Sequence, residues 1–433
     1  MVFSPRRISF IFTAYLCIFM VGCSTVSSPA ASSPAASSPS APTANPIWIA
    51  SWADAPSGTG GGAGSELTVR EIVKPTVGSR GTVRLHFSNF FGAAPVTLGG
   101  VHVGKQTSGA GVTADTAVLF NSAGSVTIPA GGTVLSDNVS LAFSYGDVLS
   151  VTEYVSGSWS SLTAHAQGPN VVTNYVTPSS SGNKTQDLAG SSFTSTTFNT
   201  YLLDRIDVYG NYKETIAAFG SSTTDGYNSG LDQHTTYPEQ LAAALQAAGH
   251  DDIGVANVGI YGTTVLGSGS TVGVNRFTRD VTSLPHVTAV IDYLGANDLR
   301  QNCITAVGLV AGKQTLIAQA HAAGLKIYEA LTAPSTFCGA QNPGGFGTRF
   351  PQGTGEEAER FLLNTWQVAT AASTVDGFAV QPSTSDGIID FAAALADPAN
   401  RSYMLPALNS GDDVHPNAAG YGSMVKAIPL TLF

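Results

Sequence analysis

The chain is poor in charge for its length. Only 11% of its 433 residues are charged, whereas 43% are hydrophobic. Lys and Arg number 19 against 29 Asp and Glu, and no basic run follows the first ten residues. This composition argues against a charge-rich disordered chain and against a nucleic-acid-binding protein. The length leaves room for two or three domains, each with a buried core.

Several common site motifs are missing as well. No group of Cys and His has the spacing of a zinc site, no glycine-rich loop has the phosphate-binding form, and the α/β-hydrolase pentapeptide G-x-S-x-G does not occur. We therefore expect neither a metal nor a nucleotide cofactor. Beyond the N-terminus, no apolar stretch approaches the ~18 residues that indicate a membrane-spanning helix.

The N-terminus has the pattern of an export signal. Two arginines precede the apolar stretch Ile8–Val21, which is shorter than the ~20 residues of a membrane span. The stretch ends in Met-Val-Gly-Cys23, which resembles a bacterial lipobox, whose cysteine is lipidated and becomes the new N-terminus. We expect residues 1–23 to be a signal peptide with a lipobox; the alternative is an ordinary cleaved signal peptide. The Ser/Pro/Ala-rich residues 24–45 are predicted to be a linker. The protein is thus expected to be a membrane-anchored lipoprotein in the periplasm or on the cell surface, or otherwise secreted.

Residues 46–210 have the pattern of an all-β domain. Short runs rich in Val, Thr, Leu and Phe alternate with Gly-rich turns, and no long helix is expected. This spacing predicts a β-sandwich or jelly-roll. Such a domain either binds carbohydrate or supports its neighbour. Four of the predicted strands are 82–87, 125–128, 148–151 and 170–173.

Residues 211–433 alternate between strand and helix patterns. This alternation predicts an α/β domain in which helices cover both faces of a parallel sheet. Ligands of such sheets bind at the carboxyl ends of the strands, so the chemistry is expected there. The predicted strands are 215–219, 255–258, 288–294 and 326–330. The predicted helices are 237–248, with Thr236 as N-cap, then 304–323, 355–372 and 417–428.

Four short segments at strand ends carry the candidate chemistry. They read GSSTTDG at 220–226, NVGIYG at 257–262, GAND at 295–298 and DDVHP at 412–416. In this order they resemble the first, second, third and fifth blocks of the SGNH/GDSL hydrolase family. The resemblance covers about residues 214–433 and implies a flavodoxin-like parallel sheet flanked by helices. Two segments of the β-domain, WIASW at 48–52 and SNFFG at 88–92, resemble a bacterial subgroup that carries such a domain before the hydrolase.

The resemblance assigns a role to each residue of a catalytic triad. The family's first block is usually GDSxTDG, which makes Ser222 the nucleophile and leaves Ser221, in place of the aspartate, as a rival hydroxyl. His415 is expected to be the base, because a serine hydroxyl becomes a strong nucleophile only when a base takes its proton. Asp412 lies three residues before His415 and is expected to orient its ring, with Asp413 as the alternative.

The oxyanion hole is expected to consist of the Ser222 N–H, the Gly262 N–H and the Asn297 side-chain amide. The sequence thus predicts an extracytoplasmic serine esterase that forms an acyl-enzyme on a small-molecule, lipid or acylated-sugar ester. Two alternatives stay open: a non-catalytic carbohydrate- or cell-wall-binding lipoprotein, and an acyltransferase that uses the same triad. The natural substrate and the oligomeric state are not predicted.

The cysteines suggest a disulfide. Of the four, Cys17 leaves with the signal peptide and Cys23 is expected to be lipidated, so Cys303 and Cys338 remain as a pair in an oxidising compartment. Both follow predicted strands at the same edge of the sheet. We expect them to form a disulfide that holds the loop of Asn297.

Overall fold

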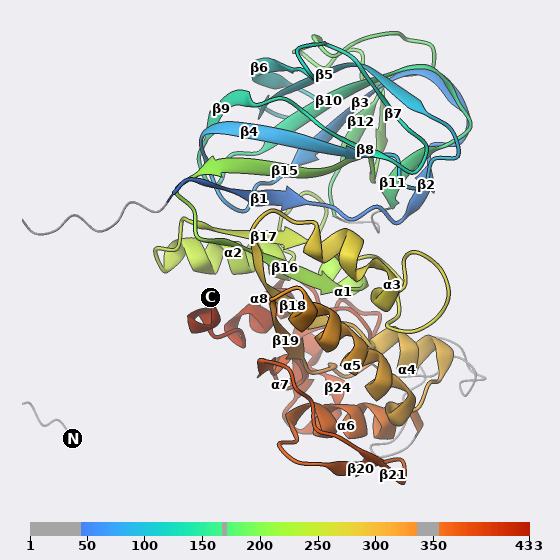
Figure 1. The fold of residues 1–433 in the computed structure, drawn as a ribbon, viewed down its shortest axis with the longest axis vertical. Coiled ribbons are helices and arrows are strands. Elements are labelled where there is room, and N and C mark those ends of the chain that lie inside the picture. Colours follow the sequence, from blue (N-terminus) through green and yellow to red (C-terminus); the bar gives the residue numbers. More distant parts are fainter. Residues whose placement is uncertain (1–44, 167–170, 336–354) are drawn as a thin grey trace, which may run out of the picture. The chain divides into compact units, whose positions relative to one another are not determined.

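The computed structural model describes residues 45–166, 171–335 and 355–433 (Figure 1). The predicted signal peptide, the linker as far as residue 44, the lipidation site Cys23 and the cysteine Cys338 lie outside these residues and stay predictions. Within the described ranges, no helix is both long enough and apolar enough to cross a bilayer.

The first part of the structure consists of antiparallel strands, which confirms the all-β prediction (Figure 1). A five-stranded sheet packs against a seven-stranded sheet through one hydrophobic core, and a small three-stranded sheet completes this region. The five-stranded sheet contains β1 (Ile47–Ala53), β15 (Leu203–Gly210), β4 (Ser79–Ser88), β8 (Thr133–Leu135) and β9 (Val139–Phe143). The seven-stranded sheet contains β13 (Ser195–Thr197), β12 (Asn174–Val176), β3 (Gly64–Val73), β10 (Leu149–Trp159), β5 (Val96–Gln106), β6 (Val112–Val118) and β7 (Val126–Ile128). The small sheet contains β14 (Asn199–Tyr201), β11 (Leu162–Ala166) and β2 (Gly58–Gly60).

One predicted strand is misplaced. The sequence pattern predicts a strand over 170–173, but the strand of this region is β12, Asn174–Val176, and residue 170 is not described. The reason lies in Asp232, which takes the backbone of this segment out of the sheet. Its carboxylate accepts from the Thr173 N–H at 2.7 Å and from the Thr173 hydroxyl at 2.8 Å, and its own N–H donates to the Val171 carbonyl.

The second part of the structure is a parallel sheet. It contains β16 (Glu214–Gly220), β17 (Ile253–Asn257), β18 (Val287–Tyr293), β19 (Lys326–Ala330) and β22 (Gly387–Ile389). Their spatial order is β17-β16-β18-β19-β22, and every neighbouring pair is parallel. This is the flavodoxin-like order 2-1-3-4-5, with its topological switch point at the carboxyl ends of β16 and β18. The α/β prediction is therefore confirmed.

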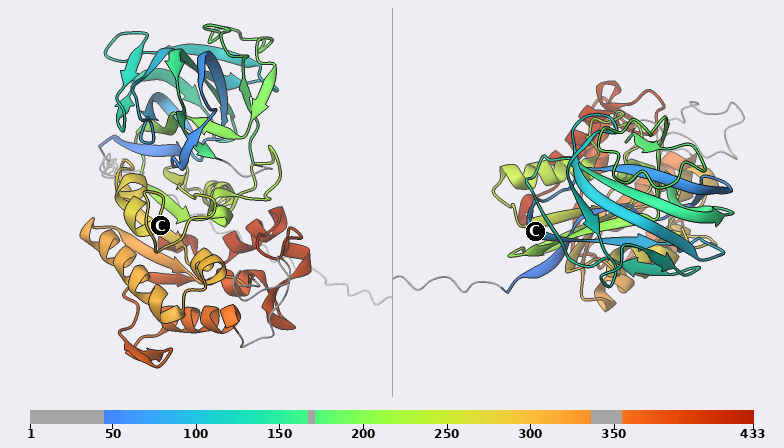
Figure 2. Two further views of the ribbon diagram at one scale, coloured as in Figure 1. Left: turned by 90° about the vertical axis from the view of Figure 1, so that its right-hand side faces the viewer. Right: turned by 90° about the horizontal axis from the view of Figure 1, so that it is seen from above.

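Helices cover both faces of this sheet (Figure 2). Alternate side chains of β16 enter two different cores: Ile216 and Ala218 pack with α2, α7 and α8, whereas Ala217 and Phe219 pack with α3, α5 and α6. The helices are α1 (Ser222–Asp225), α2 (Tyr237–Ala247), α3 (Gly273–Phe277), continued by a π-helical turn at Thr278–Thr282, α4 (Ala296–Asn302), α5 (Ala306–Ala322), α6 (Gly355–Val368), α7 (Phe391–Leu395) and α8 (Ala418–Lys426). Two 3₁₀ turns, Pro406–Leu408 and Leu430–Leu432, complete the helical segments.

The ends of two helices can be compared with the ends predicted from the sequence. Thr236 caps α2 as expected, with a reciprocal capping box to Glu239. The helix predicted over 355–372 ends earlier, at Val368. The residues after it form a hairpin of β20 (Ser373–Val375) and β21 (Phe378–Val380), whose Asp-Gly turn has positive φ at both central residues, a strong hairpin signal. A second short hairpin pairs β23 (Ala396–Asp397) with β24 (Asn400–Met404).

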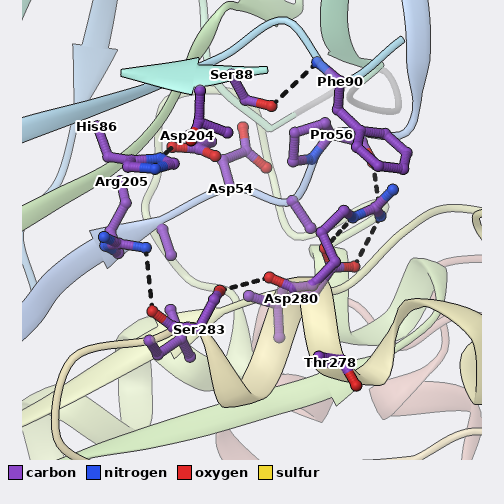
Figure 3. A pocket seen from close by; sticks show the side chains of 16 residues that line it. Asp54, Pro56, His86, Ser88, Phe90, Asp204, Arg205, Thr278, Asp280 and Ser283 are labelled. Carbon is purple, nitrogen blue, oxygen red and sulfur yellow. Dashed lines mark hydrogen bonds and ion pairs between the residues drawn. The ribbon is translucent and has the colours of Figure 1, made fainter. Parts of the chain in front are cut away.

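The antiparallel and parallel regions share packing along β1 and β17. The Ala50 N–H donates to the Thr215 hydroxyl at 2.9 Å, and the Val255 N–H donates to the Thr76 hydroxyl at 3.0 Å. Gly254 permits this approach, because a Cβ at its position would lie 2.1 Å from the Ala50 carbonyl oxygen. A cavity of about 310 Å³ also lies between the two regions (Figure 3). Its lining includes the side chains of Asp54 and Asp280 and none of the predicted catalytic residues.

Candidate active site

Ser222 begins the one-turn helix α1 directly after the carboxyl end of β16. The turn is tight, because the Ser221 carbonyl accepts from the N–H groups of both Thr224 and Asp225 at 2.9 Å. Gly220 is required here, since a Cβ would lie 1.9 Å from the Thr224 hydroxyl oxygen. The result is a serine held at the switch point of the sheet, with only 4% of its surface exposed.

Three predicted residues meet in one hydrogen-bonded row. The Ser222 hydroxyl lies 2.8 Å from His415 Nε2, and His415 Nδ1 lies 2.6 Å from an Asp412 carboxylate oxygen. The rival residues are placed differently. Ser221 stands at the N-cap of α1, and the Asp413 carboxylate accepts from the Asn409 amide at 2.6 Å. The geometry therefore favours Ser222 and Asp412 over their neighbours in the sequence.

The Asp412 carboxylate is held by its own loop. One oxygen accepts from the backbone N–H groups of Val414 and His415 at 2.9 and 2.8 Å, and the other faces the His415 ring. Burial by itself would raise the pKa of Asp412, but the hydrogen bonds from the ring and backbone of His415 and from Val414 lower it well below its usual range. Asp412 therefore stays ionised and fixes the ring tautomer that presents an unprotonated Nε2 to Ser222.

The two predicted oxyanion loops lie against each other. The Asn297 amide nitrogen donates to the Thr263 carbonyl at 2.8 Å, while its oxygen accepts from Arg300 and Gln301 at 2.7 and 3.0 Å. The amide is thereby oriented with its nitrogen toward the loop of Gly262. That glycine has φ of +73°, a left-handed conformation that side chains other than glycine rarely adopt.

A buried arginine that carries no sequence signal joins the loops of the nucleophile and of Gly262. Arg276 on α3 donates to the Gly220 carbonyl and to the Val258 carbonyl, both at 2.7 Å, so it ties together the ends of β16 and β17. Its charge is balanced by Asp280 at 2.9 Å. Only the fold brings this residue to the site, because it lies more than fifty positions beyond Gly220 in the chain.

Asp298 joins the Asn297 loop to the Gly262 loop. Its carboxylate accepts from the backbone N–H groups of Val265 and Leu266 at 2.8 and 3.0 Å. Burial raises the pKa of this carboxyl to about 6, although the two backbone donors act in the opposite direction. Asp298 directly follows Asn297 in the segment GAND, and this position could have indicated it from the sequence.

Two tyrosines line the approach to the base. The Tyr227 ring lies 4.5 Å from the His415 ring and 5.3 Å from the Tyr261 ring, centroid to centroid. Tyr261 is 53% exposed and directly precedes Gly262. Neither tyrosine was predicted as a site residue, although both lie inside or beside the motif segments. They give the site an aromatic wall.

The remaining predicted positions can be placed in part. Cys303 ends α4 in a left-handed conformation, six residues after Asn297, whereas Cys338 is outside the described residues, so the disulfide stays a prediction. Across the described ranges, no group of three or more His, Cys, Asp and Glu side chains could hold a metal ion.

The parallel-sheet region of the chain can be compared with known protein families. This part of the chain, residues 218–422, matches the model of the GDSL-like lipase/acylhydrolase family. Its parallel sheet with flanking helices is the SGNH hydrolase fold.

The solved structures to which the chain is similar include three bacterial proteins. A carbohydrate acetylesterase family member from Sinorhizobium meliloti is 18% identical, with a TM-score of 0.36, over 51% of this chain and 97% of its own. The aryl esterase of M. smegmatis is 16% identical, with a TM-score of 0.35, over 50% of this chain and 96% of its own. A GDSL-like lipase from Bacteroides thetaiotaomicron is 14% identical, with a TM-score of 0.33, over 49% of this chain and 85% of its own. No curated protein matches the chain.

Proposed function

We propose that this protein is a serine esterase that hydrolyses carboxylic esters through an acyl-enzyme. The observation that carries the proposal is the row Ser222–His415–Asp412, with contacts of 2.8 and 2.6 Å. These are the distances at which a base can take a hydroxyl proton and a carboxylate can orient that base.

The reaction follows from this row. Ser222 Oγ attacks the ester carbonyl carbon while its proton passes to His415 Nε2. The tetrahedral intermediate then expels the alcohol, whose oxygen receives that proton as the carbon–oxygen bond breaks. Water attacks the acyl-enzyme in the same way, with His415 as base, and releases the acid and Ser222. Asp412 stays ionised and stabilises the imidazolium in both halves of the reaction.

The negative charge on the former carbonyl oxygen needs donors that are in place before the reaction. In this proposal they are the Ser222 N–H, the Gly262 N–H and the Asn297 amide. The contact between Asn297 and Thr263 and the left-handed Gly262 support the assignment, because they hold two of the donors on adjoining loops. Loss of one such donor typically costs about 3 kcal/mol of the activation barrier.

The surroundings of the site favour a small uncharged ester. The aromatic wall of Tyr227 and Tyr261 offers ring faces to an acyl chain, an aryl group or the apolar face of a sugar. Neither side chain offers a carboxylate or an ammonium group that would select an ionic ester. Aryl acetates and short p-nitrophenyl esters are therefore suitable first substrates.

The test compares two neighbouring serines. Ser222→Ala should abolish ester hydrolysis, and Ser221→Ala should retain most of it, because only Ser222 faces the base. Mass spectrometry after treatment with a fluorophosphonate should find the label on Ser222. Label on Ser221, or hydrolysis by the Ser222→Ala variant at the wild-type rate, would refute the proposal.

We also propose that the enzyme acts outside the cytoplasm, anchored through a lipid on Cys23. The signal-like N-terminus and the lipobox-like segment before Cys23 support this location. Cys23→Ser should release the protein from the membrane fraction without loss of esterase activity, because the linker separates the anchor from the folded part. A wild-type protein that fractionates as soluble and carries no lipid mass would contradict the anchor.

A further inference from the structure

A histidine of the β-sandwich lies between two carboxylates, one on each side of its ring. His165 on β11 is almost fully buried, with 2% of its surface exposed. Its Nδ1 lies 3.0 Å from the Asp54 carboxylate, just after β1, and its Nε2 lies 3.3 Å from the Asp225 carboxylate. Asp225 is the last residue of α1, the turn that begins with Ser222. His165 therefore joins the sandwich to the helix of the nucleophile.

The geometry determines the charge of this ring. Nδ1 faces the Ala55 carbonyl at 2.5 Å in addition to Asp54, so everything opposite the two ring nitrogens is a hydrogen-bond acceptor. A neutral imidazole has only one N–H and would leave one nitrogen facing an acceptor without a proton. With both carboxyls ionised, a hydrogen bond at each ring nitrogen requires that both nitrogens be protonated. Burial alone would lower the pKa of His165, but Asp54, Asp225 and the Ala55 carbonyl raise it to about 10.

The next acidic groups in this region do not compete for the imidazolium charge. Glu71 on β3 and Glu153 on β10 are both buried, with side chains that lie against each other. Burial raises the pKa of Glu153 to about 8 and that of Glu71 well above its usual range, to which Asp54 contributes by charge repulsion. Burial thus favours the neutral form of both carboxyls, whereas the carboxylates within 3.3 Å of the His165 ring are those of Asp54 and Asp225.

Helix α1 is held from a second side by the Gly262 segment. A Cβ at Gly259 would lie 2.2 Å from the Asp225 backbone nitrogen, so this glycine packs directly on the end of α1. The Asp225 N–H also closes the turn onto the Ser221 carbonyl at 2.9 Å. A displacement of Asp225 would therefore be transmitted to Ser222, three residues earlier in the same turn.

We propose that His165 is a positioning residue of the esterase site: as an imidazolium between Asp54 and Asp225, it holds α1 so that Ser222 stays in line with His415. The inference rests on the proposed function of Ser222. It also assigns the β-sandwich a role in the reaction, because the sandwich supplies both His165 and Asp54.

Loss of the positive charge of His165 would be costly because its partner Asp225 is buried. Asp225 is 6% exposed, and its second carboxylate oxygen has no hydrogen-bond partner among the described residues. Without the imidazolium, this carboxylate must take up a proton or move toward water, because an unpaired buried charge is strongly unfavourable. Movement by about 1 Å at a reacting group typically costs about a hundredfold in rate. The proposed role of Asp225 is to hold α1 and not to bind substrate, so KM should change little.

The test uses substitutions that separate charge from packing. His165→Gln keeps a side-chain N–H donor but removes the charge, and we expect kcat to fall at least tenfold with KM within about twofold of wild type. The double variant H165Q/D225N restores the net charge of the cluster, so its kcat should recover at least fivefold over His165→Gln. The matched control is His102→Gln, because His102 pairs with Asp115 at 2.6 Å on β5 and β6 of the sandwich. This control should retain the wild-type kcat.

Two results would overturn the inference. One is a wild-type kcat in His165→Gln, and the other is a double variant no more active than His165→Gln, which would mean a packing role only. Nitrogen-15 NMR of the wild-type ring needs no substitution and should show both nitrogens of His165 protonated at pH 8; a neutral ring would refute the proposal even if the variants failed to fold. Failure of the proposed function looks different, because it is an inactive wild type or an active Ser222→Ala variant.

Discussion

Replacement of Asp412 by Asn tests how the proposed triad works. The asparagine keeps the shape and can still accept from the backbone N–H groups of Val414 and His415. Its amide nitrogen, however, would face His415 Nδ1 as a donor, so the ring would carry its proton on Nε2 and could not take one from Ser222.

The size of the effect can be bounded from the exposure of the carboxylate. In a triad whose aspartate is buried, this change costs about 10⁴ in kcat. The Asp412 side chain is 35% exposed, so water screens part of its interaction with the imidazolium. We therefore expect a loss of about 10² to 10³ in kcat, or roughly 3–4 kcal/mol at 1.36 kcal/mol per tenfold. KM should stay within about twofold, since the proposed role of Asp412 is to orient His415 and not to bind substrate.

The assay is steady-state hydrolysis of an aryl acetate with both kcat and KM determined. The matched control is Asp413→Asn, because this neighbouring carboxylate contacts the Asn409 amide. Its φ of +58° also suits asparagine. A loss below tenfold in Asp412→Asn, or an equal loss in Asp413→Asn, would refute the reasoning.

Three further predictions concern other parts of the structure. Asp298→Asn should lower kcat about tenfold and the free energy of unfolding by about 1–3 kcal/mol, because one of the two backbone N–H groups would face an amide NH2 in place of an acceptor oxygen. An unchanged kcat with a lowered Tm would show that the loop contact serves stability alone. Burial raises the pKa of Glu153 from 4.5 to about 8. The neutral carboxyl therefore contributes stability that is fully present below pH 4.5 and is lost as the pH rises through 8. Between pH 5 and 9, the Tm of Glu153→Gln should consequently fall by less than the Tm of wild type. Parallel Tm curves would contradict this linkage. Finally, thiol titration of the unfolded, unreduced mature protein should find no reactive thiol from Cys303 and Cys338, and two reactive thiols would show that the predicted disulfide is absent.

The sequence was informative wherever a feature depends on neighbours in the chain. The alternation of strand and helix patterns from residue 214 onward was sufficient to predict a parallel sheet, because crossover helices are what connect parallel strands. The pairing of Asp412 with His415 was predictable for the same reason, since both lie on one short loop. The strand predicted over 170–173 was wrong because Asp232, about sixty positions later, takes the hydrogen bonds of that segment.

Much of the candidate site depends on contacts that no local sequence pattern predicts. Asp412 could be selected by its spacing from His415, but its exposure and its two backbone donors belong to the folded loop. Arg276 has no motif at all; it is recognisable only because it donates to the ends of two adjacent strands.

The sequence by itself therefore determined the order of the two regions, the fold class and the residue types of the candidate triad, since these follow from periodicity and from short motifs. Only the tertiary structure decided that Ser222 rather than Ser221 faces the imidazole, because the turn of α1 directs two adjacent hydroxyls differently. It also brought His165 of the sandwich against Asp225 of the parallel-sheet region, sixty residues apart in the chain. The physical reason is that a buried charge is stable only where the fold places an opposite charge beside it. The residue that supplies this opposite charge can lie anywhere in the sequence, so local patterns do not predict the pair.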